Sequence, residues 1–171
     1  TERVYLPTIV RGRVLWHLGY SESKSAAAFT ESYGAFQRVA LEYEPSYQVR
    51  GVLTDGFDST VSSMRTLFPG VCLGYCLRHA LNKLPDKLIG VSASVRKGLR
   101  SKFHALLHRC RQRKSLRVVA LGQHLRHCAD RIATTVGEAH GARVRQWFQA
   151  KKAGWYTVLA DPQMPAMSTV L

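Results

Sequence analysis

The stretch RGVLTDGFDSTVSSMRTLFPGVCLGYCLRHALNKL, residues 50–84, decides the fold. Its apolar spacing alternates between the period of a strand and that of a helix. It predicts strand, helix, strand and helix over residues 50–54, 58–68, 71–75 and 76–84. Asp55 and Gly56 directly follow the first strand, and Pro69 and Gly70 end the first helix. Asp58 or Ser59 can start that helix, and Asp58 is the expected cap. The stretch therefore predicts an α/β fold.

Two further segments upstream favour extended backbone. Residues 3–10 and 13–20 are rich in Val, Ile, Leu and aromatic side chains, and Arg11-Gly12 lies between them. This pattern predicts a β-hairpin, in which Pro7 favours an edge position for the first strand.

A helix is expected after the hairpin, over residues 24–44. Ser23 or Ser25 can cap its start, its apolar residues follow helical spacing, and Pro45 ends it. We expect this helix to cover a single sheet, made by residues 13–20, 50–54 and 71–75.

Charge is distributed unevenly along the chain. The 171 residues carry 25 Lys and Arg against 11 Asp and Glu, a net charge of +14. Residues 1–70 hold seven basic and seven acidic residues, whereas residues 71–152 hold 18 basic and three acidic ones. Helical periodicity, without a strand, continues through residues 85–152. The sequence thus predicts a basic helical block suited to a polyanion, and it leaves the tail after Gly154 open.

The composition limits the class of protein. A hydrophobic content of 46% is ordinary for a globular domain. No apolar run has the roughly 20 residues of a membrane helix, so we expect no membrane partner. The four cysteines, Cys72, Cys76, Cys110 and Cys128, are too unevenly placed for a disulfide scaffold and indicate reduced thiols.

Cysteine and histidine also raise the question of zinc. Cys72, Cys76 and His79 lie close in sequence, and further ligands could come from His104 and His108, or from His124, His127 and Cys128. A second tight ligand pair at a familiar separation is missing, so packed or solvated side chains are favoured over zinc.

Asp55 is the residue best placed for chemistry. A carboxylate at the carboxyl end of a strand in an α/β sheet can hold a divalent cation in a crevice. An Asp-Gly pair after a strand is also common as a plain turn, and the residues alone favour that interpretation.

The order of elements around Asp55 adds a resemblance. The strand ending in Asp55-Gly56, a helix, Phe68-Pro69, a second strand and the pair Cys76 and His79 resemble the segment around the second catalytic aspartate of DDE/D transposases. The likeness is closest to the Mutator-like and related insertion-sequence groups, and it covers roughly residues 49–84.

The resemblance implies a partial ribonuclease H-like sheet with flanking helices in residues 1–84, a basic all-helical insertion in 85–152, and a tail, 153–171, leading back toward the core. It implies metal-dependent DNA strand cleavage and transfer, with Asp55 as the second catalytic acid and a ligand of Mg²⁺ or Mn²⁺. Cys76 and His79 would be the family's Cys-x-x-His pair. It places such a protein in the cytoplasm at the bacterial nucleoid, or in a eukaryotic nucleus.

The other two catalytic acids do not stand out. Glu2 lies at the very start, Glu138 falls inside a predicted helix, and Asp161 precedes a proline. We therefore expect the partners of Asp55 outside this chain, and we expect the chain alone to be inactive. The side chain of Asp55 should be accessible and face an acidic position rather than cap its own turn.

The basic block supplies candidates for DNA contact. These residues, in two dense runs with few acids nearby, are Arg96, Lys97, Arg100, Lys102, Arg109, Arg111, Arg113, Lys114 and Arg117. Trp147, Phe148, Trp155 and Tyr156 could stack on an unpaired base, although core packing is favoured for most. Two alternatives stay open: a non-catalytic nucleic-acid-binding module derived from a transposon, and a helical domain that binds an acidic protein. A homo-oligomer on transposon ends also stays open.

Overall fold

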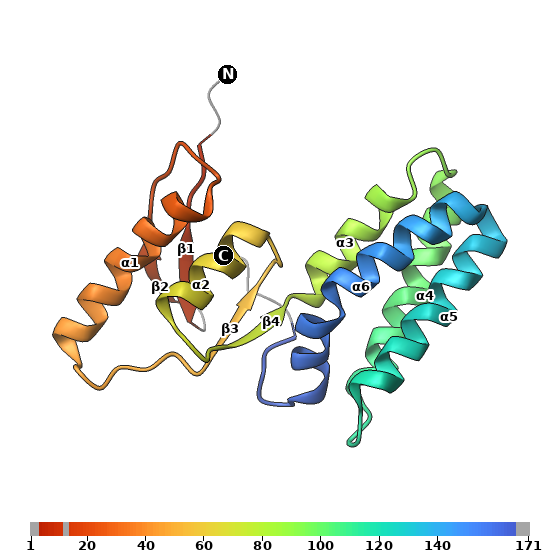
Figure 1. Cartoon of the computed structure of the whole chain (residues 1–171). Helices are drawn as coiled ribbons and strands as arrows, with labels where there is room; N and C mark the ends of the chain where they lie inside the picture. Colours follow the sequence, from red (N-terminus) through yellow and green to blue (C-terminus); the bar gives the residue numbers. More distant parts are fainter. Residues whose placement is uncertain (1–3, 12–13, 167–171) are drawn as a thin grey trace. The chain divides into compact units, whose positions relative to one another are not determined.

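The computed structural model describes residues 4–11 and 14–166, which form two compact units (Figure 1). The first unit extends to Leu73 and mixes strands with helices, whereas the second begins at Gly74 and contains four helices and the end of one strand. The α/β character of the chain and the change to a helical region agree with the sequence prediction.

A hairpin opens the first unit. Strand β1 (Thr8–Arg11) pairs antiparallel with β2 (Val14–Leu18), which confirms the predicted hairpin. Its turn residue Gly12 lies outside the described residues. Regular pairing begins after Pro7, because its ring removes a backbone donor. The carbonyl of Pro7 still accepts a hydrogen bond from the backbone N–H of Gly19, at 2.8 Å.

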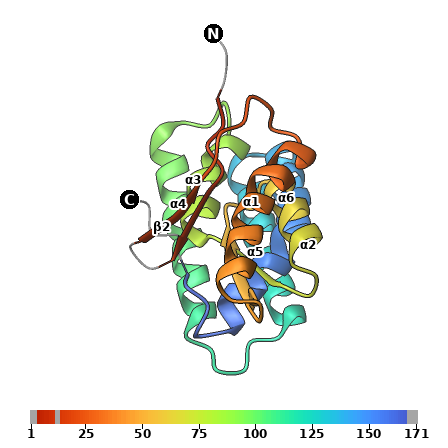
Figure 2. The same cartoon turned by 90° about the vertical axis from the view of Figure 1, so that its left-hand side faces the viewer.

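Helix α1 (Ala26–Tyr43) follows, as predicted. The Ser25 hydroxyl accepts a hydrogen bond from the Ala28 N–H at 3.2 Å, which caps the first turn. The helix ends before Pro45, whose ring disfavours helical backbone in the preceding residue. One face of α1 packs beside α2 (Figure 2). The buried side chains between these elements are Phe29, Tyr33, Phe36, Met64 and Phe68.

Strand β3 (Gly51–Thr54), helix α2 (Asp58–Leu67) and strand β4 (Cys72–Tyr75) follow in the predicted order. The predicted cap of α2 is wrong in detail, because Phe57 and not Asp58 or Ser59 occupies the N-cap position. Asp58 lies inside the first turn, where a negative charge still interacts favourably with the helix dipole.

The expectation of one joined sheet is wrong for the described residues. Strands β1 and β2 form one two-stranded sheet, and β3 and β4 form another. Ile9 of the hairpin and Val52 and Leu73 of the second sheet pack against the same aromatic cluster under α1. The two sheets of the first unit therefore share a hydrophobic core without sharing backbone hydrogen bonds, and a ribonuclease H-like sheet is not established by these strands.

Four helices make up the second unit. They are α3 (Leu77–Lys87), α4 (Ala93–Arg111), α5 (Val118–Val136) and α6 (Glu138–Ala160). The prediction that residues 85–152 contain only helices is confirmed. The sequence grouped residues 77–84 with the α/β part, whereas α3 contacts α4 and α6. The tail that the sequence left open continues α6 through Ala160.

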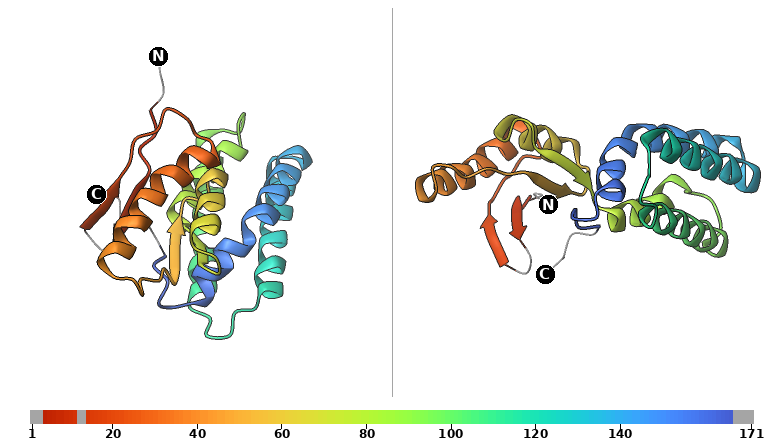
Figure 3. Two further views of the ribbon diagram at one scale, coloured as in Figure 1. Left: turned by 60° about the vertical axis from the view of Figure 1, so that its left-hand side comes forward. Right: turned by 90° about the horizontal axis from the view of Figure 1, so that it is seen from below.

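Helices α5 and α6 form a tight antiparallel pair (Figure 3). Only Gly137 separates them, and its φ of 100° is a backbone conformation that side chains rarely permit. Four residues later, a Cβ on Gly141 would overlap Ala133 of the facing helix. The close approach of the two helices therefore requires glycine at that point.

Helix α3 runs through Pro85 to Lys87, beyond the predicted end at residue 84. A proline has no N–H for the carbonyl four residues earlier, which here belongs to Leu81. The guanidinium Nε of Arg100, from α4, donates to that carbonyl at 3.1 Å, and its Nη2 donates to Asn82 Oδ1 at 2.9 Å. Arg100 thus supplies the donor that Pro85 lacks, and this allows the helix to continue.

Candidate functional site

Asp55 is exposed at the end of β3, as expected. Its carboxylate Oδ1, however, accepts a hydrogen bond from the Phe57 N–H at 2.9 Å. The neighbouring Thr54 hydroxyl accepts a hydrogen bond from the Gly56 N–H, also at 2.9 Å. The expectation that Asp55 would not cap its own turn is therefore wrong. Two successive side chains hold this turn in shape.

The charge of Asp55 acts on the core beneath it. Burial is the main reason why the pKa of Tyr33 is raised, and the negative charge of Asp55 raises it further, against an opposing hydrogen bond with Thr60. The carboxylate thus lies near the α1–α2 core of its own unit.

Asp55 belongs to no cluster of three possible metal ligands in residues 4–11 and 14–166. Within these ranges, no three His, Cys, Asp or Glu side chains come together as a possible metal site. Glu138 pairs with Arg145, and the Asp161 Oδ1 accepts a hydrogen bond from the Gln163 N–H at 2.8 Å. Of the three acids considered, Asp55 is the one whose carboxylate is exposed at the end of a strand.

The Cys-x-x-His pair lies at the start of α3. Cys76 occupies the N-cap position and is 1% exposed, and Cys72 is exposed on β4. His79 is partly buried, and its Nδ1 is enclosed without a hydrogen-bond partner among the described residues. The structure does not bring this pair together with the histidines of α4 and α5 as metal ligands, within the part of the chain that it describes.

The histidines of α4 and α5 have other partners. The rings of His104 and His108 stack on the same face of α4, with centroids 6.4 Å apart. On α5, His124 Nε2 lies 2.9 Å from Nη1 of Arg113, so the unprotonated ring nitrogen can accept a hydrogen bond from that guanidinium. Burial lowers the pKa of His124, and the nearby cations Arg113, His127 and Arg109 lower it further.

Charge follows the division of the fold. The residues of the first unit balance seven basic against seven acidic side chains, whereas residues 74–167 carry 18 basic and four acidic ones, a net +14. No acidic residue occurs from Lys87 to Ala129, a stretch that contains eleven Lys and Arg. The helical unit therefore carries essentially all of the net charge of the protein.

The nine predicted DNA-contact residues fall into two groups. Arg100 holds the turn before Pro85, Arg113 lies against His124, and Arg111 donates to backbone carbonyls at the end of α6 and beyond it, including Met164 at 2.9 Å. In the described part of the chain, the side chains of the remaining six predicted DNA-contact residues form neither an ion pair nor a hydrogen bond. This second group, the free basic set, comprises Arg96, Lys97, Lys102, Arg109, Lys114 and Arg117. All of the free basic set are exposed except Arg96, which is partly buried.

The aromatic candidates for base stacking are mostly core. Phe148 and Trp155 are 3% and 2% exposed, and both pack on Phe103 of α4. The ring centroid of Phe103 lies 5.2 Å from that of Phe148 and 5.9 Å from that of Trp155, and the centroids of Phe148 and Trp155 are 5.7 Å apart. The Tyr156 hydroxyl donates to the Leu116 carbonyl at 3.4 Å. These rings hold the helical unit together.

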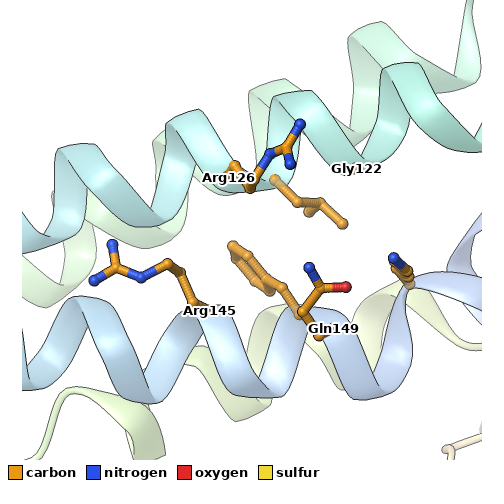
Figure 4. Close-up of a pocket in the computed structure, with 7 residues that line it drawn as sticks. Gly122, Arg126, Arg145 and Gln149 are labelled. Carbon is orange, nitrogen blue, oxygen red and sulfur yellow. The ribbon is translucent and has the colours of Figure 1, made fainter.

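Sequence reasoning missed one concave feature. A hollow between α5 and α6 is lined by Gly122, Leu125, Arg126, Arg145, Phe148, Gln149 and Lys152 (Figure 4). Its residues come from two helices and are up to 30 positions apart, so no local motif marks it.

The chain matches no protein-family model, and comparison with curated proteins and with solved structures gives no significant match. No described helix is long and apolar enough to cross a membrane.

Proposed function

We propose that this chain is part of a DNA transposase in which the helical unit binds the DNA phosphate backbone. The observation that carries the proposal is the segregation of charge: a helical unit of net +14 is joined to a neutral α/β unit. Solvated surface charge is normally mixed in sign, whereas a surface of one sign attracts a polyanion.

The free basic set provides the contacts. Ionised side chains without acidic neighbours can each neutralise a phosphate and release a condensed counterion. Lys97, Lys102 and Arg109 all extend from α4, a helix that contains no acidic residue. DNA is favoured over RNA and over an acidic protein by the resemblance to transposases.

The test is the salt dependence of DNA binding. In the triple variant Lys97→Gln, Lys102→Gln and Arg109→Gln, the slope of log affinity against log salt should fall by up to roughly 2.7, at about 0.9 for each phosphate contact. Arg65→Gln, an exposed position in the neutral unit, is the matched control and should leave the slope unchanged. An unchanged slope in the triple variant would contradict the proposal.

The catalytic part of the proposal concerns Asp55. It is supported by the observed order of β3, Asp55-Gly56, α2, β4 and α3, and by the exposure of the carboxylate at the strand end. Asp55→Asn removes the negative charge, yet the amide oxygen can still accept the Phe57 N–H, so the turn should survive. In the transposase that contains this chain, strand transfer with Mg²⁺ or Mn²⁺ should collapse while DNA binding persists.

The control is Asp58→Asn, since Asp58 lies in the first turn of α2 and should not be needed for strand transfer. The alternative function, a non-catalytic DNA-binding module, is favoured by the capping role of Asp55 and by the lack of three clustered metal ligands within the described ranges. Unimpaired strand transfer in Asp55→Asn would reject the catalytic assignment and leave the DNA-binding proposal standing.

A further inference from the structure

The hollow between α5 and α6 has an apolar floor. Leu125 of α5 and Phe148 of α6 both line it, and they are 2% and 3% exposed. Gly122 contributes no side chain, and a Cβ added there would meet nothing within 4 Å. Glycine inside a helix is less stable than alanine, and no packing constraint requires it at this point. The missing side chain leaves the hollow open.

The rim carries three cationic side chains that differ in their partners. Arg145 pairs with Asp130, at 2.7 Å, and with Glu138, so its charge is already balanced. Arg126 and Lys152 form no ion pair within the described residues. The uncompensated positive charge on the lining of the hollow therefore comes from Arg126 and Lys152.

Gln149 adds a neutral polar group between these charges. It lies one residue after Phe148 on α6 and lines the hollow beside the apolar floor. Its amide offers both donors and an acceptor, the combination that recognises the edge of a nucleobase.

We propose that this hollow binds a single unpaired nucleotide, with its base against Leu125 and Phe148 and its phosphate held by Arg126 and Lys152. The inference rests on the proposed binding of DNA by the helical unit. A paired duplex would bring phosphate to the cations but would leave the apolar floor without an occupant. An unpaired base presents a flat apolar face beside an anion, which matches both parts of the hollow.

The decisive variant is Gly122→Leu, which adds an apolar side chain to the lining of the hollow at a position where a Cβ meets nothing within 4 Å. Fluorescence anisotropy would compare a duplex that carries one extrahelical thymine with the perfectly paired duplex. The natural protein should prefer the extrahelical base by roughly fivefold or more, the range of one stacked base. Gly122→Leu should abolish the preference and keep the affinity for the paired duplex.

Gly98→Leu is the matched control, because Gly98 is also inside a helix with nothing near its Cβ position, and it lines no part of the hollow. It should keep the preference. A preference that survives Gly122→Leu, or that is equally lost in Gly98→Leu, would overturn the inference while salt-dependent duplex binding, and with it the proposed function, still stands.

A second measurement does not depend on duplex binding. In nuclear magnetic resonance titrations, thymidine monophosphate should shift the Gly122 amide and the side-chain amide of Gln149 more than inorganic phosphate does. Shifts produced by a short acidic, leucine-containing peptide and not by the nucleotide would assign the hollow to a protein partner and reject the inference.

Discussion

The contact between Arg100 and the carbonyl of Leu81 can be tested by a pair of substitutions. Arg100→Gln removes the guanidinium that donates to this carbonyl at 3.1 Å. The carbonyl lacks its usual helical donor because Pro85 has no N–H. Pro85→Ala restores a backbone N–H four residues after Leu81. The hydrogen bond from Arg100 to Asn82 is lost in both backgrounds, but it is exposed to water. The structure therefore predicts that Arg100→Gln is more harmful while Pro85 is present.

The magnitude follows from the hydrogen bond that is lost. A hydrogen bond to a charged group contributes about 1.5–3 kcal/mol, and water can partly replace this one because Arg100 is an exposed residue. We expect Arg100→Gln to lower the free energy of unfolding by about 1–2 kcal/mol. In the Pro85→Ala background the loss should fall below about 0.5 kcal/mol, so the coupling energy should be about 1 kcal/mol, within the range for residues in contact.

Urea unfolding of the four proteins, followed by tryptophan fluorescence, measures this cycle, since Trp147 and Trp155 both lie in the helical unit. Arg96→Gln is the control, because Arg96 lies on the same helix without a hydrogen-bonding partner among the described residues, and it should change stability by no more than about 0.5 kcal/mol. Equal losses from Arg100→Gln in both backgrounds would refute the role assigned to Arg100.

Four further results are expected. Arg111→Gln should lower the melting temperature, because carbonyls at the end of α6 lose their donor, whereas Arg109→Gln should only flatten the salt dependence of DNA binding. Gly141→Ala should destabilise the protein by about 1–3 kcal/mol through overlap with Ala133, whereas Gly122→Ala should stabilise it by up to about 1 kcal/mol, as thermal unfolding would show. Burial raises the pKa of the Cys128 thiol to about 11, so at pH 8 iodoacetamide should alkylate exposed Cys72 far faster, as read by mass spectrometry. Folding lowers the pKa of His124 from 6.5, so the contribution of this histidine to the free energy of unfolding should be complete above pH 6.5. That contribution should fall as the pH drops toward the pKa in the folded state. In unfolding curves measured at several pH values, His124→Gln should remove this fall.

The candidate site was only partly predictable. The sequence marked Asp55 correctly as an exposed residue at a strand end, since an apolar run followed by Asp-Gly determines both its position and its exposure. It did not reveal that Oδ1 is bound by the Phe57 N–H, because such a turn and a metal ligand need the same residue types. Nor could it separate Arg111 from Arg109: both are basic residues in one run, and only the chain that packs against each determines whether its charge is used internally.

The sequence by itself determined the order of strands and helices, a serine cap at Ser23 or Ser25, the wholly helical character of residues 85–152 and the division of charge, because these depend on local spacing and composition. Tertiary structure alone decided which strands pair, how α3 passes Pro85, and which cations line the α5–α6 hollow. The physical reason is distance along the chain. Strand pairing, the Leu81–Arg100 contact and the hollow each join residues from separate elements, and a pattern with a period of two or 3.6 residues contains no information about such partners.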